Sequence, residues 1–136
     1  MRKSSEPKKL LEFEIAFYER LLQKHPDFVD ALKALGEVYT RRGWYEKGLA
    51  VDLKLAQLKA DDPIVWYNLA CSYSLLRRPD DAVQALRQAI ARGYDDFEYL
   101  GTDPDLQPLR QSPQFRRFLI HVASQRFRFA KFPQHF

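Results

Sequence analysis

The sequence has few of the residues that build common metal, redox and nucleotide sites. Its 136 residues include one cysteine, Cys71, so it cannot form an intramolecular disulfide or a site of several thiolates, which favours a reducing compartment. The five glycines are dispersed and form neither a phosphate-binding loop nor a dinucleotide-binding motif. The histidines His25, His121 and His135 are not spaced as metal ligands. We therefore expect neither a metal nor a cofactor.

Long apolar runs are also missing. No stretch approaches the roughly 20 apolar residues of a membrane span, and the charged N-terminal residues lack the apolar run of a signal peptide. These absences predict a cytoplasmic protein without a membrane span.

Acidic residues occur in pairs, but their positions do not suggest catalysis. The pairs Asp61-Asp62, Asp80-Asp81 and Asp95-Asp96 precede or begin predicted helices, where negative charge is favourable beside the helix N-terminus. Capping explains them without acid–base chemistry. With no other catalytic pattern in the chain, we predict that the protein is not an enzyme.

Acidic residues are absent from the last part of the chain. Asp105 is the last of them, and residues 106–136 carry six cations, whereas residues 1–105 hold 16 basic and 18 acidic residues. The body is thus nearly neutral and the C-terminal part is basic.

What the sequence does have is helical periodicity over most of its length. Apolar residues recur at helical spacing over residues 7–24, 28–42, 45–59 and 63–90, with a break at 77–79 in the last stretch. The first of these is expected to bury a broad stripe containing two apolar rows. Asp27 and Asp62 are expected N-caps, and Gly43 supplies a turn. The composition, 46% hydrophobic and 29% charged, suits one compact domain.

A repeat of 34 residues relates the second and third of these helices to the next pair. The displacement aligns Leu32 with Trp66, Gly36 with Ala70, and Tyr39 with Tyr73, without a gap. Such a repeat indicates stacked helix–turn–helix units. Asp52 aligns with Leu86 in the next copy, and its carboxylate either turns towards water, which we favour, or bonds to a neighbouring helix.

These residues resemble the tetratricopeptide repeat family, whose pattern is W-x2-L-G-x2-Y followed by A-x3-F and P. One copy carries it as Trp66, Leu69, Ala70, Tyr73, Ala82 and Leu86, and the other as Leu32, Leu35, Gly36, Tyr39 and Gly48. The resemblance implies an all-α fold, a short right-handed α-solenoid of antiparallel helix pairs with helical caps.

The same resemblance suggests boundaries. An arm, residues 1–9, precedes a helical domain, residues 10–125, and a basic aromatic tail, residues 126–136, follows it. The domain divides into a half-repeat, two repeats and a capping segment similar to those that close bacterial arrays of this family. These parts cover residues 10–26, 29–62, 63–92 and 93–125. Asp103 and Ser112 are expected caps in the closing segment, and the tail is interpreted as helical to about residue 130, disordered, or docked in a groove.

The resemblance further implies a protein–protein interaction module, an adaptor that holds a peptide or protein segment in a concave groove. The groove-facing positions in the repeat register are Asp30, Lys33, Glu37, Thr40, Arg41, Ile64, Tyr67, Asn68, Cys71 and Ser74. Lys33 and Asn68 match two positions at which some family members clamp a peptide carboxylate. Glu37 would repel that carboxylate, so we do not expect a clamp. We expect instead a mixed-charge peptide that contacts Tyr67 and Lys33.

Two alternatives come from the basic end. The first is an anionic partner, nucleic acid or lipid, bound through Arg116, Arg117, Arg126, Arg128 and Lys131. The second is a purely structural role in which the tail phenylalanines join two copies. A solvated charged face without a partner is the simpler explanation of these cations, so nucleic acid is not the favoured partner.

Overall fold

The computed structural model describes residues 6–129, with side chains up to residue 125. Within this range the regular structure is helical throughout, which confirms the predicted all-α class. The elements are α1 (Lys8–Lys24), α2 (Val29–Arg42), α3 (Tyr45–Leu58), α4 (Pro63–Leu75), α5 (Pro79–Ala91), α6 (Phe97–Leu100), the 3-10 helix η1 (Pro104–Leu106), α7 (Gln107–Arg110) and α8 (Pro113–Phe129).

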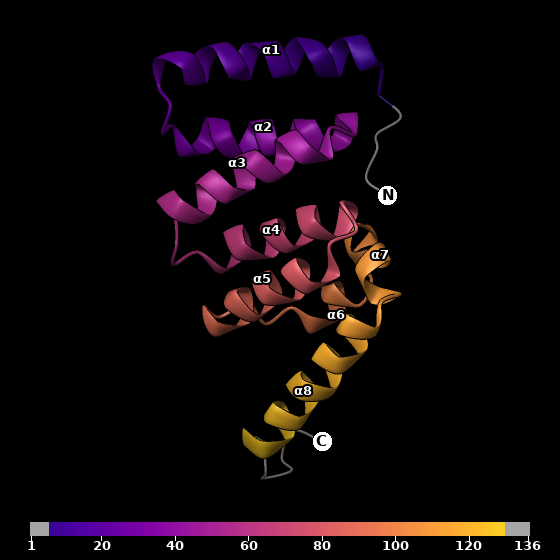
Figure 1. Ribbon diagram of the computed structural model, residues 1–136. Coiled ribbons are helices and arrows are strands. Elements are labelled where there is room, and N and C mark those ends of the chain that lie inside the picture. Colours follow the sequence, from indigo (N-terminus) through magenta and orange to yellow (C-terminus); the bar gives the residue numbers. More distant parts are fainter. Residues whose placement is uncertain (1–5, 130–136) are drawn as a thin grey trace.

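The first five helices form a layered stack in which each packs against the next along the chain (Figure 1). Short turns join them, so neighbouring helices run in opposite directions. None of the helices in the described range is both long and apolar enough to cross a membrane. The stack therefore brings successive helix faces together, as an amphipathic sequence requires.

The helix pair recurs with the spacing found in the sequence. Helices α2 and α4 begin at Val29 and Pro63, and α3 and α5 begin at Tyr45 and Pro79, 34 positions apart in each case. Gly36 shows why small residues lie in the layers, because a Cβ added there would meet Val51 Cγ1 at 3.4 Å. The close approach of α2 and α3 thus depends on a position without a side chain.

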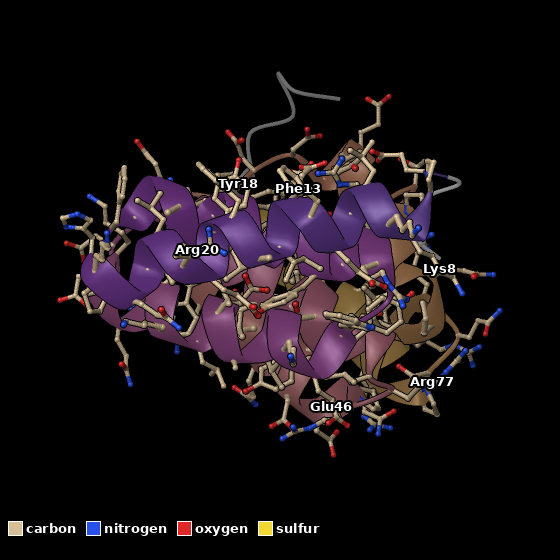
Figure 2. All side chains as sticks on the ribbon, turned by 90° about the horizontal axis from the view of Figure 1, so that it is seen from above. Lys8, Phe13, Tyr18, Arg20, Glu46 and Arg77 are labelled. Carbon is tan, nitrogen blue, oxygen red and sulfur yellow. The ribbon has the colours of Figure 1, made fainter. Side chains whose placement is uncertain are left out.

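The first helix buries less than its pattern predicts. In one apolar row Leu11 and Ile15 are 1% and 3% exposed, whereas Leu10, Phe13 and Phe17 in the other row are 50%, 73% and 56% exposed. Figure 2 looks down on this end of the stack, where Phe13 is labelled on α1. The expected broad buried stripe is wrong because α1 packs mainly against one neighbour, α2.

The caps follow the sequence predictions at four helix starts and not at a fifth. Asp62 accepts a hydrogen bond from the Ile64 amide at 2.9 Å, and Asp96, Asp103 and Ser112 cap α6, η1 and α8 in the same way. The predicted cap by Asp27 is wrong: α2 begins after Phe28 without a side-chain cap. Asp27 instead forms an exposed ion pair with Lys54 at 3.3 Å.

These two aspartates offer a matched test of capping. We expect Asp62→Ala to lower the free energy of unfolding by about 1 kcal/mol, because it leaves the Ile64 amide without its acceptor. Asp27→Ala should cost no more than about 0.5 kcal/mol, the usual scale of an exposed ion pair. Urea unfolding of both variants measures the difference. Equal losses would show that the Asp62 bond adds nothing beyond a surface charge.

The C-terminal segment folds back over the second helix pair. The short elements η1 and α7 contact α4, and α8 contacts α5. Phe115 and Phe118 on α8 are 4% and 1% exposed. Helix α8 continues to Phe129, which agrees with the helical interpretation of the tail as far as that residue. Residues 1–5 and 130–136 lie outside the described range.

Candidate functional site

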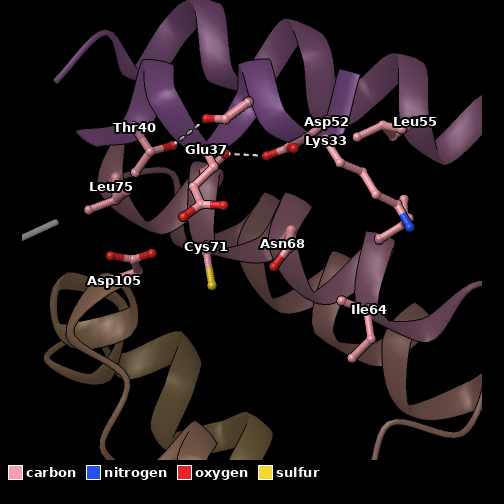
Figure 3. Close-up of a pocket in the computed structure, with 13 residues that line it drawn as sticks. Lys33, Glu37, Thr40, Asp52, Leu55, Ile64, Asn68, Cys71, Leu75 and Asp105 are labelled. Carbon is pink, nitrogen blue, oxygen red and sulfur yellow. Dashed lines mark hydrogen bonds between the residues drawn. The ribbon is translucent and has the colours of Figure 1, made fainter. Parts of the chain in front are cut away.

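A groove of about 370 Å³ opens between α2 and α4, with η1 at one end (Figure 3). This volume is within the range of small-ligand sites. We call it the acidic groove, and its lining residues are Lys33, Gly36, Glu37, Thr40, Asp52, Leu55, Ile64, Val65, Asn68, Cys71, Ser72, Leu75 and Asp105.

Helix α2 contributes three of the five positions expected from it. Lys33, Glu37 and Thr40 line the groove, one helical turn apart on a single face. Asp30 is exposed but is not among the lining residues. Arg41 turns away, because its guanidinium pairs with Glu6 of the preceding segment at 3.0 Å.

Helix α4 presents a narrower open surface than expected. Ile64 and Asn68 are exposed and line the groove. Tyr67, Cys71 and Ser74 are only 5%, 6% and 1% exposed, and the expectation that Tyr67 and Ser74 face the groove is wrong, because neither is among the lining residues. Of the three, Cys71 still contributes to the groove wall.

The cause of this burial is the closing segment. The Tyr67 hydroxyl donates to Asp103 at 2.7 Å, and its ring stacks on that of Tyr94 with centroids 4.3 Å apart. Ser74 Oγ accepts from the Leu109 amide at 3.2 Å. Burial and the neighbouring Cys71 and Asp103 raise the pKa of the Tyr67 hydroxyl well above its usual range, so it remains a donor.

The same segment adds a wall that repeat register does not reveal. Asp105, in η1, lines the groove although it lies far from α2 and α4 in the sequence. Figure 3 shows its carboxylate on one side of Cys71, with Glu37 above and Asn68 on the other side. Asp103 and Pro104 were recognisable in the sequence as a helix start. No signal in the sequence indicated that this short helix, η1, would pack against α4.

Asp52 is buried rather than turned to water. It is 9% exposed and accepts a hydrogen bond from the Ser72 hydroxyl at 2.5 Å. Burial raises the pKa of this carboxyl to about 6, although the bond from Ser72 opposes the change. The expectation of a solvated Asp52 is wrong because Gly36 and Ser72, both small, leave room for the carboxylate between three helices.

The charge of the groove is predominantly negative. Within the described residues, its lining brings the carboxyls of Glu37, Asp52 and Asp105 against the single ammonium of Lys33. Lys33 lies 3.9 Å from Asp62 at one end, where its charge is partly balanced. Burial, and then the charges of the surrounding aspartates, raises the pKa of the Cys71 thiol well above its usual range.

One cluster in this region has the composition of a metal site. The ligand atoms of Cys71, Asp103 and Asp105 all lie within 4.8 Å of one another. Both oxygens of Asp103 already accept hydrogen bonds, one from Tyr67 and the other from the Asp105 amide. The raised pKa of the Cys71 thiol disfavours the thiolate that a metal would bind. The cluster is accounted for as the cap and anchor of η1.

The residues expected to bind an anionic partner are only partly described. Arg116 and Arg117 are exposed on α8, which packs against α5 and α7 and does not line the acidic groove. The side chains of Arg126 and Arg128, and all of Lys131, lie outside the described residues. The structure therefore places two of the five cations on one exposed surface.

Comparison with known proteins gives one limited similarity. The chain is 31% identical over 100 residues to a chloroplastic protein from Arabidopsis thaliana, in an alignment that covers 71% of this chain and 28% of that protein. The chain thus spans less than a third of the length of this relative. No family model and no solved structure matches the chain.

Proposed function

We propose that the chain is a tetratricopeptide-type repeat domain whose acidic groove binds a segment of a partner protein through a Lys or Arg side chain. Support for the repeat type comes from the 34-residue recurrence of both helices and from the small residues between them. The similarity to part of a longer protein fits a domain that can also occur within a longer polypeptide. In this proposal the chain has no catalytic role and acts in the cytoplasm.

The observation that carries the proposal is the negative charge of an open groove. Glu37 is exposed and its carboxylate points towards Cys71 and Asn68 (Figure 3). A cationic side chain entering there would meet the exposed carboxylate of Glu37 and could donate to the Asn68 carbonyl, while Asp105, which is 4% exposed, forms the wall behind them. The mixed-charge peptide expected from the sequence is revised accordingly, because Tyr67 is covered and Lys33 lies at the end of the groove.

Apolar residues complete the site. Ile64 is 52% exposed and lines the groove beside Leu55 and Val65. An apolar side chain next to the cation would bury this surface, which contributes about 25 cal/mol per Å². The groove therefore favours a short segment with one cation and an apolar neighbour.

A positional-scanning peptide library, probed with the full chain, tests the proposal. We expect enrichment of Lys and Arg and a loss of affinity of at least about tenfold for Glu37→Lys, since the substitution replaces an attraction with a repulsion. The affinity should also fall as salt rises from about 50 to 300 mM, because charge pairs at an open groove are screened.

Glu46→Lys is the matched control. Glu46 is exposed at the start of α3, is not among the lining residues, and carries the same change of net charge. It should bind peptides like the parent chain. Enrichment of acidic peptides, or equal affinities for the two variants, would contradict the proposal.

A further inference from the structure

The proposed function leaves the last part of the chain unused. Residues 126–136 contain Arg126, Arg128 and Lys131, four phenylalanines and no acidic residue. Lys131 stands beside Phe132, so the segment has the cation and apolar neighbour that the acidic groove favours. The chain thus carries both a negatively charged groove and a positively charged segment.

The geometry of α8 disfavours pairing within one copy. This helix has 17 residues and leads away from α2 and α4 (Figure 1), over a length of about 25 Å at 1.5 Å per residue. Residues 130–136, fully extended, span at most about 25 Å. They would have to run straight back along the whole of α8 merely to reach its first residue. The groove begins beyond that point, on α2 and α4.

We propose that residues 126–136 of one copy occupy the acidic groove of a second copy. Lys131 meets the exposed Glu37 there, and an adjacent phenylalanine covers Ile64. This inference rests on the proposed function, because it uses the same groove. It adds a partner: the chain itself. A groove that holds the tail cannot bind another cationic segment unless that segment displaces the tail.

Two full-length variants separate the halves of the contact. The groove variant, Glu37→Lys, keeps its tail, and the tail variant, Arg126→Gln with Arg128→Gln and Lys131→Gln, keeps its groove. We use sedimentation velocity at about 50 mM salt and at chain concentrations up to about 300 µM. We expect the parent chain to associate in this range, and each variant alone to associate at least about tenfold more weakly. An equimolar mixture of the variants should associate again, since one intact groove then meets one intact tail.

The inference is overturned if the parent chain stays monomeric, if the tail variant associates like the parent, or if the mixture of variants does not associate. A labelled oligolysine peptide, titrated into the tail variant, distinguishes this failure from that of the proposed function. If oligolysine binds and Glu37→Lys abolishes its binding while the parent chain never self-associates, the groove is a cationic-peptide site and the tail is not its ligand. If neither contact forms, both proposals fail.

Discussion

Replacing Phe118 with alanine is expected to lower the free energy of unfolding by about 3–5 kcal/mol, the usual cost of deleting a buried aromatic ring. Phe118 is 1% exposed and lies on α8, where the helix covers α5. Its ring lies 5.8 Å from that of Phe115 and beneath the Arg87 guanidinium, 5.5 Å from the ring centroid. Truncation leaves a cavity beside Phe115 and Arg87.

The next residue provides the control for this loss. Leu119 is 44% exposed on the same helix, so Leu119→Ala should cost about 1 kcal/mol or less. Chemical denaturation followed by circular dichroism measures both variants. Equal effects of the two substitutions would show that α8 is not held by the face that contains Phe118.

Replacing Asp52 with asparagine is expected to stabilise the chain at neutral pH and to have a smaller effect in acid. The pKa of this carboxyl is about 6 in the folded chain against 3.8 for an ordinary aspartate, so the folded state binds the extra proton between these values. Wild-type stability therefore carries a penalty that is full above pH 6 and disappears below pH 3.8. Asparagine resembles the protonated side chain and escapes the penalty.

The expected gain is about 3 kcal/mol at pH 7.5 and about 1 kcal/mol at pH 4.5, measured as the difference in free energy of unfolding between variant and parent. Asp30→Asn is the control, since Asp30 is exposed on α2. It should change stability by no more than about 0.5 kcal/mol at either pH. A gain for Asp52→Asn that does not vary with pH would contradict the assignment of the raised pKa to Asp52.

The same substitution bears on binding. Asp52 lines the acidic groove, and its ionisation above pH 6 adds a negative charge close to the place of a cationic ligand. Affinity for a cationic peptide should therefore rise between about pH 5 and pH 7 in the parent chain. Asp52→Asn removes that part of the rise, so stability and affinity respond to it in opposite directions.

Local signals in the sequence were sufficient for the helical framework. The helices α2 to α5 were predictable because apolar spacing and turn residues are local signals, and these signals recur after 34 residues. Asp62 and Asp103 were identifiable as caps because a cap bonds an amide two residues ahead. Asp27 was misassigned because its carboxylate pairs with Lys54 on α3, a choice that depends on the packing of two helices.

The groove was predictable on one side only. Repeat register identified Lys33, Glu37 and Asn68, because helical spacing fixes which residues share a face. It could not show that η1 would cover Tyr67, since this contact joins residues 36 positions apart. Nor could it show that Ser72 would hold Asp52 inside, because the bond spans two helices whose approach is set by the layers between them.

The anchoring of η1 and α7 on α4 also determines the order in which contacts become available as the chain is synthesised. Helices α2 to α5 have all their mutual contacts available once residue 91 has been added to the chain. The Tyr67 hydroxyl receives its acceptor only when Asp103 follows, and Ser74 its donor only when Leu109 does. A nascent chain that ends between residues 91 and 103 therefore contains helices α2 to α5 but not yet Asp105, the wall that η1 adds to the acidic groove.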